Sequence, residues 1–140
     1  MRQYARQCKL CAMGSTRAHE GPLIVVVDND AGMRLALERL LSAAGFRTRV
    51  FASTGALRDS GCVASADFLV LDMRLPGESG ADYYTSLPSP KPPAVFITAH
   101  DEPASRRNAL RAGACAFLVK PFDGAALLDS FASATWRKNA

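Results

Sequence analysis

Four polar side chains stand at the ends of apolar, strand-like runs of the sequence. They are Asp28, Asp72, Thr98 and Lys120. Two carboxylates, a hydroxyl and an ammonium group form a complementary set: together they can hold a divalent cation, accept a phosphoryl group and neutralise its charge. Each alone has an ordinary explanation, such as a loop-capping aspartate, but four strand ends that supply four complementary groups favour a common site.

These side chains meet only if the runs before them lie side by side in one sheet. Continuous apolar runs at 23–27 and 67–71 are typical of strands buried on both faces of a parallel sheet. The segment 46–51 alternates and suits an edge strand. Runs at 94–98 and 115–119 complete five predicted strands.

Helix-like segments separate the strands. Helical spacing and stop signals predict helices at 31–44, 53–60, a short stretch ending at 87, 101–112, and a final helix capped by Asp123. Strict alternation of five strands and five helices predicts an α/β fold with a doubly wound parallel sheet. In such sheets the ligand crevice lies beyond the carboxyl ends of the strands.

Charge and composition exclude several classes of protein. Residues 1–20 carry +3 of the net charge of +4. The rest of the chain therefore lacks the excess of positive charge that direct nucleic-acid binding would need. No apolar run is long enough to span a membrane. Cys62 and Cys115 are predicted to be buried thiols, which favours a cytoplasmic setting. The pair Cys8 and Cys11 lacks further zinc ligands, and we interpret it as part of an extension.

Four motifs carry a family resemblance. They are VVVDND (25–30), LVLDMRLPGESG (69–80), VFITAH (95–100) and FLVKPF (117–122). With these motifs in this order, the chain resembles the receiver domain of two-component response regulators. The residues of the motifs are most similar to those of the FixJ and LuxR-type receivers. The resemblance implies the flavodoxin-like (CheY-like) five-stranded fold with strand order 2-1-3-4-5. It also implies a flexible N-terminal extension (1–21), a receiver domain (22–137) and a C-terminal tail (138–140).

The resemblance further assigns a phosphoacceptor and a metal site. Asp72 would take a phosphoryl group from a sensor histidine kinase with the help of Mg²⁺. The metal ligands would be Asp28, Asn29, Asp72 and the backbone carbonyl of Arg74.

Other residues acquire roles from the same resemblance. Lys120 would pair with a phosphoryl oxygen, and Thr98 would donate its hydroxyl to another once the phosphoryl group is present. Thr98 and Phe117 would form the switch, and the face formed by the helix 101–112, the fifth strand and the last helix would change on phosphorylation. The bond between Lys120 and Pro121 matches one that is usually cis in the family.

Asn29 departs from the family pattern, which usually has an acidic residue at this position. Loss of that charge should weaken Mg²⁺ binding, because an ion and a carboxylate about 4 Å apart attract by roughly 4 kcal/mol at an effective dielectric near 20, before desolvation. The alternative is therefore a degenerate receiver that binds partners without phosphorylation. A flavin-phosphate binder is a third hypothesis, but Asp28, Asn29 and Asp30 would repel phosphate without a metal.

The partners follow from the resemblance. We expect a signalling switch rather than an enzyme, a sensor histidine kinase as partner, and a homodimer through the switching face. A C-terminal DNA-binding effector domain, absent from this sequence, would be present if the chain is the front part of a transcription factor.

Overall fold

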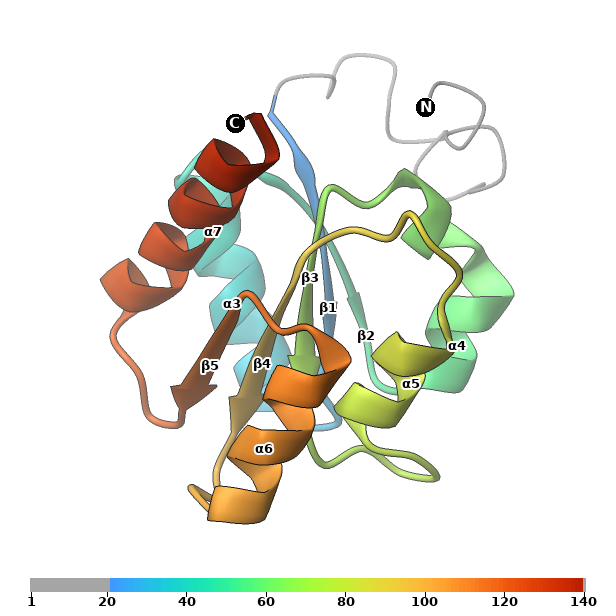
Figure 1. Ribbon diagram of the computed structural model, residues 1–140. Helices are drawn as coiled ribbons and strands as arrows, with labels where there is room; N and C mark the ends of the chain where they lie inside the picture. The colour runs from blue at the N-terminus through green and yellow to red at the C-terminus, as the bar shows by residue number, and fades with distance from the viewer. Residues whose placement is uncertain (1–20, 140) are drawn as a thin grey trace.

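The computed structural model describes residues 21–139, with side chains as far as residue 133. The strands are β1 (Leu23–Val27), β2 (Arg47–Phe51), β3 (Phe68–Asp72), β4 (Ala94–Thr98) and β5 (Ala116–Val119). The helices are α3 (Ala31–Ala43), α4 (Thr54–Ser60), α5 (Gly80–Ser86), α6 (Pro103–Ala112) and α7 (Gly124–Asn139), and a short 3-10 helix η1 spans Cys62–Ser65. Figure 1 shows the strands in the centre of the molecule with helices on either side.

The five strands form one parallel sheet in the order β2-β1-β3-β4-β5, which confirms the predicted topology. All residues of β1, β3 and β4 are buried. Their apolar, largely β-branched runs suit strands that are covered on both faces. The parallel register brings the carboxyl ends of β1, β3, β4 and β5 to the same edge.

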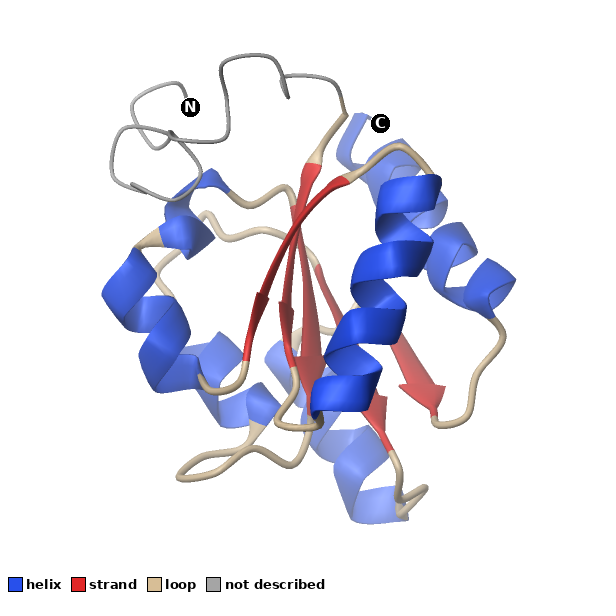
Figure 2. Cartoon of the chain, turned by 180° about the vertical axis from the view of Figure 1, so that it is seen from behind, coloured by secondary structure: helices blue, strands red, loops and turns tan. Residues whose placement is uncertain are grey.

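Helices lie on both faces of the sheet (Figure 2), and an apolar cluster packs under the helices of each face. On one face α4, α5 and α6 contribute Leu57, Tyr83 and Ala109. On the other face α3 and α7 contribute Leu41 and Phe131, whose ring packs near Phe68 with centroids 5.0 Å apart. The loops at the carboxyl edge are therefore held on a packed three-layer body.

Several element boundaries differ from those predicted. Helix α6 begins at Pro103 rather than at residue 101, since proline suits the first helical position and Asp101 instead pairs with Arg106. Strand β3 starts one residue later than predicted because the Asp67 carboxylate accepts the N–H of Leu23 at 2.8 Å, and Asp72 is itself the last strand residue. The 3-10 helix η1 was not predicted.

The prediction for Cys62 is partly wrong. Its side chain is fully buried as expected, but it is disulfide-bonded rather than a thiol. Cys8, Cys11 and the predicted extension, up to residue 20, lie outside the described residues. Among the described residues, none of the helices is long and apolar enough to cross a membrane.

Candidate functional site

The register of the sheet places the four predicted side chains at one edge. Val27 is paired with Leu71, so the next residues, Asp28 and Asp72, are neighbours. Thr98 is the last residue of β4 and is paired with Val119, which precedes Lys120. The Lys120 N–H donates to the Thr98 carbonyl at 2.7 Å and extends this pairing by one residue.

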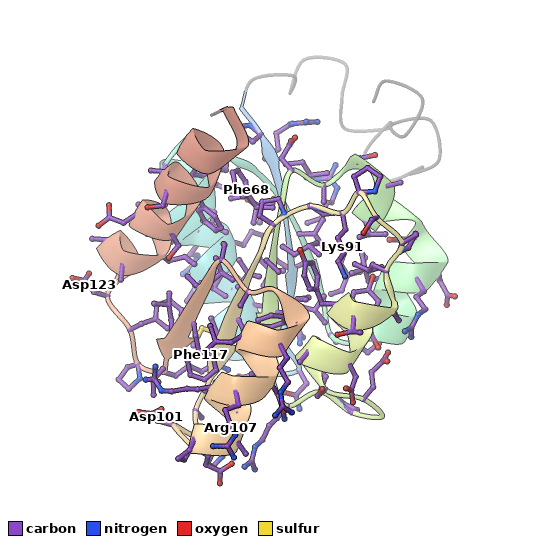
Figure 3. All side chains as sticks on the ribbon, viewed as in Figure 1. Phe68, Lys91, Asp101, Arg107, Phe117 and Asp123 are labelled. Atoms are coloured by element: carbon purple, nitrogen blue, oxygen red, sulfur yellow. The ribbon has the colours of Figure 1, made fainter. Side chains whose placement is uncertain are left out.

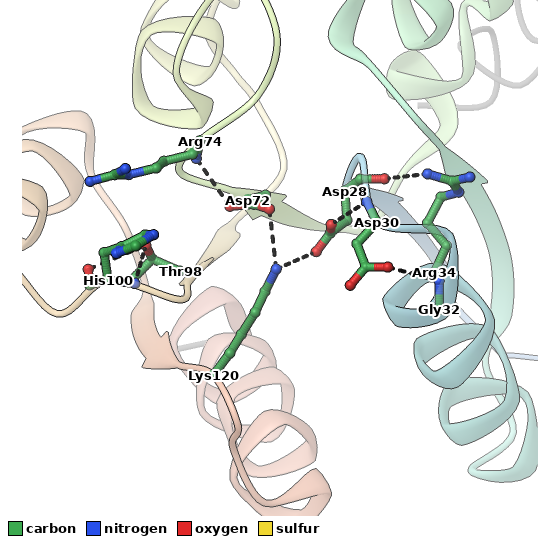
Figure 4. A network of polar contacts seen from close by, with 9 residues as sticks. All are labelled: Asp28, Asp30, Gly32, Arg34, Asp72, Arg74, Thr98, His100 and Lys120. Atoms are coloured by element: carbon green, nitrogen blue, oxygen red, sulfur yellow. Dashed lines mark hydrogen bonds and ion pairs between the residues drawn. The ribbon is translucent and has the colours of Figure 1, made fainter.

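Lys120 bridges the two aspartates (Figure 4). Its Nζ lies 2.7 Å from Oδ2 of Asp28 and 3.1 Å from Oδ2 of Asp72. The Asp28 and Asp72 side chains are 0% and 7% exposed, and that of Lys120 is 15% exposed. A buried pair of carboxylates is costly unless a cation and hydrogen bonds compensate it, and Lys120 supplies the cation.

Local backbone amides hold the other carboxylate oxygens. Asp28 Oδ1 accepts the N–H of Asp30 at 2.9 Å, and Asp72 Oδ1 accepts the N–H of Arg74 at 3.0 Å. These turns of two residues fix each carboxylate against its own loop. The two aspartates are thus oriented by the chain before any ligand arrives.

The titration of the site reflects burial and like charge. Burial raises the pKa of Asp72, and the nearby charge of Asp28 adds to this, although the Arg74 amide and Lys120 oppose it. Burial by itself would lower the pKa of Lys120, but the hydrogen bond to Asp28 and the charges of both aspartates outweigh it, and the pKa is raised. Lys120 therefore stays charged throughout the physiological range.

Thr98 also lies at the carboxyl edge, and its hydroxyl is hydrogen-bonded to a residue of its own loop. Its hydroxyl accepts the N–H of His100 at 3.1 Å and donates to the His100 carbonyl at 3.3 Å, within its own turn. Phe117 lies on β5 and packs partly buried against the cluster under α6 (Figure 3). The guanidinium of Arg106 covers its ring, 4.9 Å from the centroid. The Lys120–Pro121 bond is cis, as the resemblance implied.

The donor set fits a hard divalent cation with few protein ligands. No cluster of three or more His, Cys, Asp or Glu side chains suited to a metal occurs in the part of the chain that the structure describes. Mg²⁺, however, keeps several waters and is commonly held by one or two carboxylates. Asp28 and Asp72, buried and convergent, provide that pair.

Asn29 and Asp30 add little charge to this pair. Both residues are exposed. Asp30 is the N-cap of α3, and its Oδ1 accepts the N–H of Gly32 at 3.0 Å, so one of its oxygens is committed to the helix. The site thus has two buried acidic side chains, Asp28 and Asp72, and lacks the third acidic side chain that the family pattern usually has at position 29.

Sequence reasoning missed several residues that support the site. Arg34 of α3 donates to the Asp28 carbonyl at 2.7 Å, on the side of Asp28 away from Lys120 in Figure 4. Glu78, in the loop after β3, accepts from Thr54 of α4 and pairs with Arg58, both at 2.7 Å. An arginine four residues after a helix N-cap is too common a feature to single out Arg34, and nothing in the sequence marked Glu78.

The Arg74 side chain forms a further contact that was not predicted. Only its backbone carbonyl was considered, whereas its guanidinium pairs with Glu102 across two loops at 3.1 Å. The two residues are 28 positions apart, so no local pattern indicates that they meet.

A doubly wound parallel sheet with an Asp–Lys–Asp cluster at its carboxyl edge is an open α/β domain whose polar groups gather where such domains bind their ligands. The family described as "Response regulator receiver domain" matches residues 24–132. The chain therefore belongs to the response regulator receiver domain family. The fold it shows, five parallel strands in the order 2-1-3-4-5, is CheY-like.

Relatives of several kinds are similar to this chain. Nodulation protein W of Bradyrhizobium diazoefficiens is 37% identical over 126 residues, which is 89% of this chain and 56% of that protein. The response regulator protein TmoT of Ectopseudomonas mendocina is 35% identical over 80% of this chain and 52% of its own length. The chain thus spans about half the length of these relatives.

Solved structures agree on the fold. A response regulator receiver protein from Burkholderia phymatum is 34% identical, with a TM-score of 0.72, over 81% of this chain and 94% of its own. The BeF3-activated DrrB receiver domain is 24% identical with a TM-score of 0.72, over 82% and 97% of the two chains, and supports the fold alone.

Proposed function

We propose that the chain is a phosphoacceptor receiver that takes a phosphoryl group on Asp72 from a sensor histidine kinase. The observation that carries the proposal is the Lys120 bridge between Asp28 and Asp72, both buried at the carboxyl edge of the sheet. A nucleophilic carboxylate, a fixed cation and a second carboxylate that can hold a metal are the groups that phosphoryl transfer requires.

The transfer balances as a displacement at phosphorus. A carboxylate oxygen of Asp72 forms a bond to the phosphorus of a phosphohistidine, and the phosphorus–nitrogen bond breaks. The electron pair of that bond stays on the imidazole nitrogen of the kinase, and a proton on the other ring nitrogen keeps the departing imidazole neutral. The product is an aspartyl phosphate on Asp72 and a neutral histidine on the kinase.

The chain's own residues position the nucleophile and accept the new charge. The Arg74 amide fixes one oxygen of Asp72, and Lys120 pairs with the other and is placed to neutralise a phosphoryl oxygen. Mg²⁺, held by Asp28, Asp72 and the carbonyl of Arg74, would supply charge neutralisation between an anionic nucleophile and an anionic phosphoryl group.

The switch is proposed to start at Thr98. Its hydroxyl is engaged with His100 and must leave this turn in order to bond a phosphoryl oxygen. Movement of Thr98 at the end of β4 would change the packing of Phe117 on the adjacent β5. It would thereby change the face formed by α6, β5 and α7. This is a two-state packing change of the kind that phosphorylation commonly drives.

The test is phosphodonor labelling of the whole chain. Acetyl phosphate with Mg²⁺ should add about 80 Da, the mass of one phosphoryl group, to the intact protein, and Asp72→Asn should abolish the adduct. Asp82→Asn, a change of an exposed aspartate on α5, is the matched control and should be labelled normally. No Asp72-dependent adduct with Mg²⁺ present would refute the proposal.

A degenerate receiver is the second candidate, and the exposed Asn29 is the observation that favours it. In that case the chain would bind its partner in one state only. Asn29→Asp separates the two candidates: a receiver limited only by its metal should show Mg²⁺ affinity raised roughly tenfold and faster labelling. If neither Asn29→Asp nor Asp72→Asn changes partner affinity with phosphodonor present, the degenerate reading is correct.

We propose the remaining assignments on the strength of family membership. The chain would act as a cytoplasmic signalling switch rather than an enzyme on a separate substrate. Its partners would be a sensor histidine kinase and, in a longer protein, a DNA-binding effector domain. The domain limits 22–137 and the tail 138–140 remain predictions.

A further inference from the structure

The Arg74 side chain starts beside the proposed phosphoacceptor but points away from it. Its backbone N–H donates to Asp72 Oδ1 at 3.0 Å, so the side chain begins one hydrogen bond from that carboxylate. Its guanidinium extends away from Asp72 (Figure 4) and pairs with Glu102 at 3.1 Å, whose own N–H donates to the His100 carbonyl at 3.1 Å. The pair joins the loop after β3 to the N-cap residue of α6.

The Arg74–Glu102 pair is easily broken. The two side chains are 56% and 55% exposed. Exposed ion pairs contribute little to stability because water solvates both partners and ordering long side chains costs entropy. A stronger anion within reach of Arg74 would therefore displace Glu102.

A phosphoryl group on Asp72 would be that stronger anion. It carries between one and a half and two negative charges and three acceptor oxygens, against one charge on Glu102. Lys120 is a single cation and is already shared between Asp28 and Asp72. Asn29 leaves the metal site without a third acidic side chain, which weakens Mg²⁺ binding. More of the phosphoryl charge is then left for a second protein cation to neutralise. The planar guanidinium also matches two phosphoryl oxygens at once.

We propose that the Arg74 guanidinium is a second cationic ligand of the phosphoryl group on Asp72, and that this guanidinium stays paired with Glu102 until the phosphoryl group is present. The inference rests on the proposed phosphoacceptor function. Its consequence is reciprocal: phosphorylation releases the tie between the β3–α5 loop and α6, and loss of Glu102 favours binding of the phosphoryl group.

The experiment measures binding of BeF3⁻ with Mg²⁺, a non-covalent phosphoryl mimic, by titration followed with two-dimensional NMR. Four full-length proteins form a double-mutant cycle: wild type, Arg74→Gln, Glu102→Gln and the double variant. Arg74→Gln should weaken binding about fivefold and Glu102→Gln should tighten it about threefold. In the Arg74→Gln background, Glu102→Gln should have no effect.

The neighbouring Asp101 provides the matched control. It pairs with Arg106 at 2.6 Å and is about as exposed as Glu102, so Asp101→Asn removes the same charge from the same loop without touching Arg74. Its affinity for BeF3⁻ should stay within twofold of wild type. Equal tightening by Asp101→Asn and Glu102→Gln would show a general charge effect and overturn the inference.

Hydrogen exchange gives a second readout. The Arg106 amide, which donates to the Glu102 carbonyl in the first turn of α6, should exchange several-fold faster after wild type binds BeF3⁻. In Glu102→Gln this amide should exchange fast before binding. If wild type binds BeF3⁻ but the effects of Arg74→Gln and Glu102→Gln are additive and the exchange rate of the Arg106 amide is unchanged, only the role of Arg74 is refuted. If wild type never binds BeF3⁻, the proposed phosphoacceptor function is refuted together with the role of Arg74.

Discussion

The surroundings of the Asp72 carboxylate partly disfavour its negative charge. It is buried beside a second aspartate, and burial together with that neighbour raises its pKa despite Lys120 and the Arg74 amide. Groups at functional sites are often held in this way, at some cost in stability. Lys120 limits that cost, since it pairs with both carboxylates at once.

Replacing Asp72 should therefore stabilise the metal-free protein. Asp72→Asn keeps the shape of the side chain, removes the like charge and leaves Lys120 paired with Asp28. We expect a gain of about 1 kcal/mol at pH 7.5, or roughly 4 °C in Tm. The measurement is a thermal melt followed by circular dichroism in EDTA.

The gain should depend on pH in a defined direction. Because the folded pKa of Asp72 is raised, the folded state binds the proton at higher pH than the unfolded state does, and the contribution of Asp72 to wild-type stability falls as pH rises through this window. Asp72→Asn lacks this loss, so its advantage should vanish near pH 3.5 and reach a plateau above the folded pKa. An equal or lower Tm than wild type at pH 7.5 would contradict the interpretation.

Among the secondary-structure elements, α5 packs directly against the end of β3. Gly80 begins α5, and a Cβ at this position would overlap the carbonyl oxygen of Asp72 and lie 3.3 Å from the Leu71 Cβ. The Gly80 N–H also donates to the Met73 carbonyl at 3.1 Å. The helix thereby fixes the backbone of the proposed phosphoacceptor.

Gly80→Ala should push α5 away from β3. The rigid backbone must shift to admit the methyl group, and we expect a loss of about 2 kcal/mol together with slower labelling of Asp72. Urea unfolding and phosphodonor labelling measure the two effects. Gly55→Ala is the matched control, because a Cβ there meets only Ser53 Oγ at 3.8 Å; it should be neutral or slightly stabilising. Similar results for both variants would argue against close packing at Gly80.

The loop after β3 is also tied to α4 through Glu78. Its carboxylate pairs with Arg58 and accepts from the Thr54 hydroxyl, and these two contacts, Arg58 first, lower the pKa of Glu78. A lowered carboxyl pKa contributes stability that is present above the unfolded pKa and lost as pH falls through the folded pKa.

Glu78→Gln should remove this contribution at neutral pH but not in acid. We expect the urea midpoint at pH 7 to fall by roughly 0.3 M, a small effect because Arg58 is half exposed. The difference from wild type should shrink to nothing as the pH falls to about 3. A difference that persists at pH 3 would show that the packing of the side chain, rather than its charge, stabilises the loop.

Across the whole molecule, one surface combines apolar and charged groups suited to self-association. On α6, Leu110 is 70% exposed and lies between the exposed arginines Arg107 and Arg111. The exposed Asp129 on α7, the helix that covers the other face of the sheet, offers the opposite charge. A two-fold dimer that sets α6 of one copy against α7 of the other would pair these charges and cover Leu110.

This dimer is a prediction that sedimentation can check. With BeF3⁻ and Mg²⁺ the wild type should sediment as a dimer, and Leu110→Ser should weaken association at least tenfold, since a central apolar contact is lost. Leu35→Ser, on α3, changes the other large apolar side chain that is exposed among the described residues, and it should leave association unchanged. Loss of the dimer in both variants, or in neither, would exclude this face.

The sequence by itself determined the strands and helices and the edge of the sheet at which the polar side chains of the strand ends lie. Apolar, β-branched runs such as 23–27 can be buried only in strands covered on both faces, and the regular alternation with helices leaves few topologies. Asp28, Asp72, Thr98 and Lys120 could be identified because each directly follows or closes a strand. Hydrophobic patterning is local, so it can be read from neighbouring residues.

Only the tertiary structure decided which side chains meet across loops. The bridge from Lys120 to Asp28 joins residues 92 positions apart. The pairs of Arg74 with Glu102 and of Glu78 with Arg58 depend on how the loops after β3 and β4 fold over the sheet. The structure also decided that the hydroxyl of Thr98 is hydrogen-bonded to His100 and that Cys62 is disulfide-bonded. Such contacts are set by loop conformation and by the competition of each polar group for partners, and no periodic signal in the sequence records that competition.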